Sequence, residues 1–165
     1  MPEVAVIMGS KSDLVAVQPA LDILKKFNVS NEVRVISAHR TPDEAHKFAE
    51  EAESRGVKVI IAAAGKAAHL GGVLASYTIL PVIGIPIMST TLDGLDSLLS
   101  MVQMPSGISV ACVAINGSLN AGLLAIQMLS LNDERLKTEL KNYKKLMRDN
   151  VIADDISVTK EVSGK

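Results

Sequence analysis

The sequence predicts an α/β protein in which helices cover both faces of a doubly wound parallel sheet of five strands. Short apolar runs typical of buried strands alternate along the chain with segments of helical periodicity. Three consecutive apolar runs also lead into loops that contain glycine, serine or histidine. Parallel strands deliver such loops to one edge of a sheet, which is where α/β proteins bind ligands.

The first half of the chain contains three predicted strand–helix units. The strands are expected at residues 2–8, 31–36 and 57–63, and the following helices at 12–27, 42–55 and 68–76. Pro19 removes a backbone hydrogen bond from the first helix, so we expect a kink or a late start there. In the second helix, the hydroxyl of Thr41 is expected to cap the start, Pro42 to take the first position and Gly56 to end it.

The second half adds two strands and an extra helix. The strands are expected at 80–87 and 108–115, and the helices after them at 92–102 and 119–131. Five strands joined in this way predict a flavodoxin-like sheet with the order 2-1-3-4-5 in a three-layer α/β/α arrangement. A C-terminal helix is expected from 132 to about 150, with one apolar stripe formed by Leu136, Leu140, Tyr143 and Met147.

Residues 153–165 are polar and without periodicity, which predicts a frayed, flexible tail. The chain shows no internal repeat and no linker composition, so residues 1–165 are expected to form a single domain.

Composition excludes several functional classes. Apolar residues make up 48% of the 165-residue chain, which is incompatible with intrinsic disorder. The chain has 17 basic and 18 acidic residues, so its net charge is close to zero. It therefore has no broad positive electrostatic field that would attract nucleic acid or an anionic membrane. Cys112 is the single cysteine, so the chain cannot form an internal disulfide. No signal peptide or membrane-spanning run is evident, which predicts a cytoplasmic location.

The strongest functional signal is the turn at 37–42, which places His39 and Arg40 between a predicted strand and a helix start. Unpaired backbone N–H groups make such a turn an anion site, and Arg40 adds a fork that suits phosphate. The loops at 9–13 and 64–72 are expected at the same edge of the sheet. The residues alone therefore point to a small anionic ligand held by Ser10, Asp13 and Arg40, with His39 and His69 available for proton transfer. A capped helix with solvated polar residues would be the better interpretation of any one of these loops by itself.

Common cofactor sites do not fit these loops. The first loop lacks the glycine spacing of a dinucleotide fingerprint and the Gly-Lys-Ser/Thr of a nucleoside-triphosphate loop. The third strand ends in alanines, where a phosphoacceptor domain would place an acid. His39, His46 and His69 are the only histidines, and no acidic pair stands at metal-ligand spacing from them. We therefore expect neither a cofactor nor a metal, and no role for His46.

Several motifs together resemble one enzyme family. They are Met8-Gly9-Ser10-Lys11-Ser12-Asp13, Ser37-Ala38-His39-Arg40-Thr41-Pro42, Ala67-Ala68-His69-Leu70, Asp96-Ser97-Leu98, Gln103-Met104-Pro105-Ser106-Gly107 and Asn120-Ala121-Gly122-Leu123-Leu124-Ala125. In this order they resemble the 5-(carboxyamino)imidazole ribonucleotide mutases, the mutase branch of the phosphoribosylaminoimidazole carboxylase catalytic subunits. The resemblance covers residues 4 to about 150.

The resemblance implies an isomerase that moves a carboxylate from the exocyclic nitrogen of the substrate to the adjacent ring carbon. The product would be 5-amino-1-(5-phospho-ribosyl)imidazole-4-carboxylate, an intermediate of de novo purine (IMP) biosynthesis, and no cofactor would be needed. His39 matches the acid/base of the family, and the loop with His69 would confine carbon dioxide. The implied catalytic residues are His39 and His69. The implied substrate-binding residues are Gly9, Ser10, Ser12, Asp13, Ser37, Ala38, Arg40, Gly65, Lys66 and Ala67. The family also implies a homo-octamer that acts after an ATP-dependent carboxylating synthetase.

The chain departs from the family pattern at Lys66 and Gly71, where the family usually has glycine and proline, and at Pro19, where its helix is usually uninterrupted. Lys66 either points to solvent or places its ammonium near the migrating carboxylate. Two alternative functions remain open. One is the related carboxylase branch, which uses free carbon dioxide and aminoimidazole ribonucleotide, and which typically has lysine in place of Arg40 and no counterpart of His69. The other is a non-catalytic nucleotide-binding module.

Overall fold

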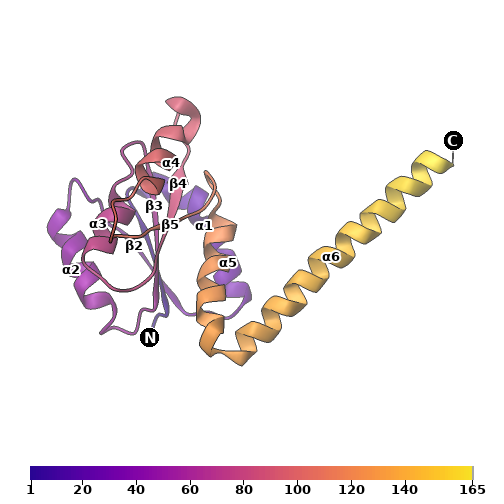
Figure 1. Ribbon diagram of the computed structural model, residues 1–165, viewed down its shortest axis with the longest axis horizontal. Coiled ribbons are helices and arrows are strands. Elements are labelled where there is room, and N and C mark those ends of the chain that lie inside the picture. The colour runs from indigo at the N-terminus through magenta and orange to yellow at the C-terminus, as the bar shows by residue number, and fades with distance from the viewer. Residues whose placement is uncertain (165) are drawn as a thin grey trace. The chain divides into compact units, whose positions relative to one another are not determined.

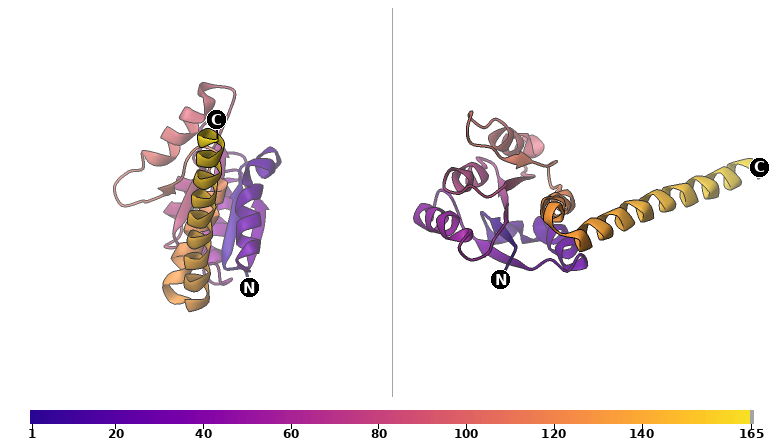
Figure 2. Two further views of the ribbon diagram at one scale, coloured as in Figure 1. Left: turned by 90° about the vertical axis from the view of Figure 1, so that its right-hand side faces the viewer. Right: turned by 60° about the horizontal axis from the view of Figure 1, so that its bottom comes forward.

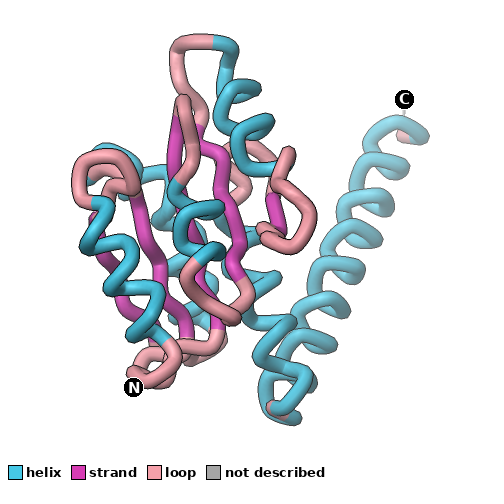
Figure 3. Tube along the Cα trace, turned by 60° about the vertical axis from the view of Figure 1, so that its left-hand side comes forward, coloured by secondary structure: helices cyan, strands magenta, loops and turns pink. Residues whose placement is uncertain are grey.

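The computed structural model describes residues 1–164 and confirms the predicted fold class. Five parallel strands form one sheet in the order β2-β1-β3-β4-β5. The strands are β1 (Val4–Met8), β2 (Asn31–Val35), β3 (Val59–Gly65), β4 (Val82–Ile87) and β5 (Ala111–Cys112). Figures 1 and 3 show the central strands side by side with helices in front of and behind them.

Burial follows the position of each strand in the sheet. Every residue of β1 and β4, and β3 from Val59 to Ala64, is buried, which explains why these runs are continuously apolar. The edge strand β2 is mostly exposed and carries Glu32 and Arg34. Continuously apolar runs therefore mark the buried strands of the sheet, and charged residues mark the exposed edge strand.

The edge strand β5 has only two residues, where the sequence predicted a strand over 108–115. Val113 donates its backbone N–H to Gly84 in β4, and the next β4 residue that faces β5 is Pro86. Because proline has no N–H, the ladder cannot continue in its regular pattern. Asn116 instead donates its backbone N–H to the carbonyl of Pro86, and the strand ends early.

Helices cover both faces of the sheet, as Figures 1 and 2 show. They are α1 (Leu14–Lys26), α2 (Pro42–Ala52), α3 (Leu70–Ser76), α4 (Leu95–Val102) and α5 (Ser118–Leu129), with 3₁₀ turns at Lys11–Asp13, Leu92–Gly94 and Ser130–Asn132. On one face, Phe48 of α2, Leu74 of α3 and Met101 of α4 join the strand side chains in one core. On the other face α5 packs closely on α1, since a Cβ built on Gly122 would lie 2.4 Å from the Ile23 side chain.

Helix boundaries differ slightly from the predictions. α1 begins at Leu14, after a separate 3₁₀ turn, and runs through Pro19 to Lys26. The expected late start is thus small, and the proline does not end the helix. α2 ends at Ala52, earlier than expected, and Gly56 follows in the left-handed region with a φ of +91°.

The chain divides into two compact units, the first spanning Met1–Met128 and the second beginning at Leu129. Within the second, α6 runs from Glu134 to Ser163, and the carboxylate of Asp133 caps it by accepting from the N–H of Leu136. The predicted helix end near residue 150 is wrong, and residues 153–163 of the predicted frayed tail are helical, while Lys165 lies outside the described residues. Residues 151–163 contain neither proline nor glycine. A helix already formed upstream therefore extends through them at low cost.

In α6, Leu136 and Leu140 of the predicted stripe are buried, whereas Met147 is exposed. Within residues 1–164, no helix combines the length and the apolar character needed to cross a bilayer.

Candidate active site

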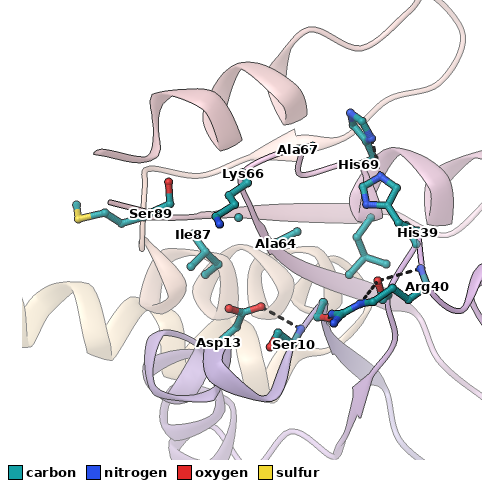
Figure 4. A pocket seen from close by; sticks show the side chains of 16 residues that line it. Ser10, Asp13, His39, Arg40, Ala64, Lys66, Ala67, His69, Ile87 and Ser89 are labelled. Atoms are coloured by element: carbon teal, nitrogen blue, oxygen red, sulfur yellow. Dashed lines mark hydrogen bonds between the residues drawn. The ribbon is translucent and has the colours of Figure 1, made fainter. Parts of the chain in front are cut away.

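A cavity of about 650 Å³ lies at the carboxyl edge of the sheet, where the loops after β1, β2, β3 and β4 meet. The strand order reverses between β1 and β3, so the loops that follow these strands diverge and leave space between them. Figure 4 shows the residues that line this space. They are Gly9, Ser10, Asp13, Ser37, Ala38, His39, Arg40, Ala64, Gly65, Lys66, Ala67, His69, Leu70, Ile87, Met88 and Ser89.

The loop after β1 is held by a reciprocal capping box. The Ser10 hydroxyl accepts from the N–H of Ser12 at 3.3 Å, and Asp13 Oδ2 accepts from the N–H of Ser10 at 3.1 Å. Gly9 donates its backbone N–H to Ala63 of β3, which ties the turn to the neighbouring strand. These bonds fix Ser10 and Asp13 on one side of the cavity, as Figure 4 shows.

Burial raises the pKa of the Asp13 carboxyl above its ordinary value of 3.8. Hydrogen bonds from Ser10 and Ser12 and the charge of Arg40 act in the opposite direction but do not outweigh the loss of hydration. An additional donor from a ligand would stabilise the ionised carboxylate. A ribose hydroxyl is the kind of donor that would do so.

The loop after β2 folds around the Ser37 side chain. The Ser37 hydroxyl accepts from the backbone N–H of Arg40 at 3.2 Å and from its Nε at 3.3 Å. Arg40 Nη2 also donates to the carbonyl of Gly9 at 3.0 Å. The guanidinium is thus pinned beside the first loop, and its remaining N–H groups are left for an anion.

The predicted capping role of Thr41 is wrong. Its hydroxyl accepts from the N–H of Ser37 and donates to the carbonyl of Ser37, both at 3.0 Å, and makes no capping bond to α2. Pro42 does take the first helical position as predicted. Because the hydroxyl closes the loop on itself, it shapes the turn that carries His39 and Arg40.

His39 and His69 meet at one end of the cavity, although thirty positions separate them in the chain. His39 Nε2 lies 2.8 Å from His69 Nδ1, and the two rings are nearly perpendicular, at 86°. One of these nitrogens donates and the other accepts, so a single proton is shared between the rings. The outer nitrogens, Nδ1 of His39 and Nε2 of His69, remain as the two ends of a short relay.

The loop after β3 places Lys66 in the left-handed region, with a φ of +56°. This conformation disfavours residues other than glycine. Figure 4 shows the Lys66 side chain directed into the cavity, across from Ser10 and Asp13. The ammonium therefore faces the ligand space.

Eleven of the twelve predicted site residues line the cavity. Ser12 does not line it, but its hydroxyl donates to the Ser10 hydroxyl at 2.8 Å within the first loop. The predicted site residues did not include Ala64, Ile87, Met88 and Ser89, and they included Leu70 only as part of the loop expected to confine carbon dioxide. Three of these come from the end of β4, and the rule that all parallel strands deliver their carboxyl ends to one edge was the available signal.

His46 lies outside the cavity, where it pairs with Glu50 at 2.8 Å on α2. Among residues 1–164, no three histidine, cysteine, aspartate or glutamate side chains converge in a way that could hold a metal ion.

Comparison with known proteins agrees with the fold and with the motifs. The N5-carboxyaminoimidazole ribonucleotide mutase of Saccharolobus solfataricus is 55% identical over 153 residues, which cover 93% of this chain and 97% of that protein. The protein of the same name from Pyrococcus abyssi is 55% identical over 148 residues, 90% of this chain and 85% of that protein.

A solved structure, that of Treponema denticola PurE, superposes with a TM-score of 0.86 at 31% identity and covers 94% of this chain and 97% of that one. The family model described as AIR carboxylase matches residues 3–150. With one family model spanning most of the sequence and relatives matched over nearly their full length, this chain belongs to the AIR carboxylase family.

Proposed function

We propose that this protein is an N5-carboxyaminoimidazole ribonucleotide mutase, an isomerase of purine biosynthesis. The contact between His39 and His69 carries the proposal, because an isomerisation of this kind needs one proton delivered and one removed at the same small site. The mutase relatives, each about 55% identical, support the same reaction.

The substrate offers two features that this cavity can bind. Its phosphate suits the guanidinium of Arg40, which is anchored by Ser37 and Gly9 beside the first loop. Its ribose hydroxyls suit the carboxylate of Asp13, which lies in the cavity lining and is partly desolvated by burial. These two contacts would direct the imidazole ring toward the histidine pair.

The chemistry requires one bond to break and one to form. As the bond between the exocyclic nitrogen and the carboxyl carbon breaks, its electron pair returns to the nitrogen, which takes a proton from the histidine relay. The released carbon dioxide stays beside the ring, where the apolar side chains of Ala64, Leu70 and Ile87 line the cavity. The enamine-like ring carbon then attacks it, and the relay recovers a proton from that carbon. No net proton is gained or lost.

A hydrogen-bonded pair suits this sequence better than one imidazole. If a proton enters at one outer nitrogen, the shared proton shifts and another leaves from the far end. The pair is therefore an acid first and a base second without exchange with bulk water, as an intramolecular transfer demands.

Two alternatives are less well supported. The carboxylase branch would typically replace Arg40 and lack His69, yet both side chains line this cavity. A non-catalytic nucleotide-binding module would have no use for two histidines in hydrogen-bond contact. The deciding assay follows absorbance with purified protein and either the carboxylated nucleotide alone or aminoimidazole ribonucleotide with bicarbonate. The mutase turns over the first substrate without bicarbonate, whereas preference for the second overturns the proposal.

Further properties are proposed from the same resemblance. We expect a cytoplasmic homo-octamer that takes its substrate from an ATP-dependent carboxylating synthetase. Light scattering on the purified protein measures the number of subunits, and a coupled assay with such a synthetase tests the order of the two reactions.

A further inference from the structure

Lys66 adopts a conformation that its residue type does not favour. A lysine in the left-handed region is destabilised by roughly 1–2 kcal/mol compared with ordinary helical or extended backbone. Glycine carries no such cost. Strain of this kind persists only where surrounding structure maintains it, and it concentrates at functional sites.

The strain places a cation in the cavity. Lys66 is the only lysine among the lining residues of the described chain, and its side chain is directed into the ligand space. Its ammonium forms no ion pair with any carboxylate of residues 1–164. The cavity thus contains a positive charge that the protein itself leaves unpaired.

The two cationic side chains that line the cavity, Arg40 and Lys66, differ in how the protein holds them. Arg40 is tied to Ser37 and Gly9, at the side where the first two loops meet. Lys66 stands on the third loop, three positions before His69. The proposed substrate likewise carries two anionic groups, a phosphate and a carboxylate, at opposite ends.

We propose that the ammonium of Lys66 binds the carboxylate that migrates, a role that rests on the mutase function proposed above. Arg40 is a rigid fork suited to a phosphate that stays in place. An ammonium on a flexible stem has three donors without a fixed plane, so it can follow a carboxylate from the nitrogen to the ring carbon. Lys66 is then a substrate-binding residue specific to the carboxylated nucleotides.

The charge of the carboxylate decides which kinetic constant responds. Lys66 stabilises the carboxylate in both substrate and product, but the carbon dioxide formed between them is neutral. Loss of the ammonium therefore raises KM for both isomers and leaves kcat unchanged or slightly higher, because it removes ground-state binding.

The test compares three substitutions at this position. Lys66→Met removes the ammonium and keeps the strained backbone, and we expect it to raise KM about 10- to 100-fold in both directions. Lys66→Arg keeps the charge and should retain affinity within a few-fold of wild type. Lys66→Gly removes the charge and relieves the strain, so it should bind as weakly as Lys66→Met while raising Tm. Lys47→Met, an exposed lysine on α2, is the matched control.

Calorimetric binding separates the carboxylate from the phosphate. Aminoimidazole ribonucleotide carries the phosphate but no carboxylate, so its Kd should be the same for wild type and Lys66→Met. An equal loss of affinity for carboxylated and uncarboxylated nucleotides would assign Lys66 to the phosphate and overturn the inference. Unchanged KM for both isomers in Lys66→Met would overturn it too. Absence of turnover in the wild-type protein would overturn the mutase proposal instead, and the two binding measurements would still decide the role of Lys66.

Discussion

His39 and His69, from loops after different strands, share one hydrogen-bonded proton across 2.8 Å between Nε2 and Nδ1. While the contact lasts, only one of these two nitrogens carries the proton, and the other accepts the hydrogen bond. The tautomer of one ring therefore sets the hydrogen-bonding role of the other.

Replacing either histidine should stop proton transfer but spare binding. We expect His39→Asn and His69→Asn each to lower kcat at least about 100-fold, with the Kd of the uncarboxylated nucleotide within a few-fold of wild type. Because the rings act in series, the double variant should be little worse than the worse single variant. Stopped-flow or steady-state absorbance measures kcat, and calorimetry measures Kd.

His46→Asn is the control for these variants, since His46 pairs with Glu50 outside the cavity. It should keep full activity. Multiplicative losses in the double variant would show that the two rings act independently, contrary to the relay.

The affinity for the nucleotide phosphate should depend on the shape of the Arg40 side chain as well as on its charge. In Arg40→Lys the ammonium cannot bond Ser37 and Gly9 while also presenting a fork to phosphate. We expect the Kd of aminoimidazole ribonucleotide to rise at least about tenfold, which corresponds to ~1.4 kcal/mol of binding free energy. Arg34→Lys, on the exposed strand β2, should bind normally. Wild-type affinity in Arg40→Lys would remove Arg40 from the phosphate site.

Asp13 should make stability depend on pH. Its pKa is raised in the folded protein by burial, so between 3.8 and that raised value the folded chain binds a proton that the unfolded chain has lost. The contribution of Asp13 to the free energy of unfolding therefore falls as pH rises through that window. Above the window, the ionised carboxylate continues to destabilise the folded protein.

Asp13→Asn cannot ionise and still offers an oxygen to the N–H of Ser10. We expect the Tm of the variant to exceed that of wild type by an amount that grows as pH rises from 3.8 through the raised pKa and then stays constant, while nucleotide affinity drops about tenfold. Thermal melts at a series of pH values measure the difference. A Tm difference that stays constant over this range would rule out a raised pKa at Asp13.

Gly122 should be required for the contact between α5 and α1. A Cβ there would lie 2.4 Å from the Ile23 side chain and 3.1 Å from the carbonyl oxygen of Ala20. Gly122→Ala should therefore lower the free energy of unfolding by about 1–3 kcal/mol, because the helices must move apart.

Gly71 in α3 provides the comparison, since a Cβ there meets its nearest neighbour, the Val110 side chain, at 3.5 Å, an ordinary contact. Gly71→Ala should be neutral or slightly stabilising, because alanine loses less backbone entropy on folding. Denaturant titration measures both. Equal stability of the two variants would contradict the close packing of α1 and α5.

The sequence by itself determined the order of the elements, the strand order and the three loops that meet at the cavity. These follow from local signals: apolar runs, turn residues and the handedness of parallel crossovers all act over short stretches of chain. The motif around His39 and Arg40 was visible for the same reason. The full length of α6 was not predicted, because about half of residues 151–163 are β-branched and such residues favour helix only weakly.

Only the tertiary structure decided the rest. The early end of β5 depends on Pro86 facing it from β4, and the hydrogen bond between His39 and His69 depends on two loops converging in space. The direction of the Lys66 side chain, into a cavity that four separate loops enclose, likewise depends on those loops meeting in space. Each of these is a relationship between segments distant in the chain, and local propensity carries no information about distances of that kind.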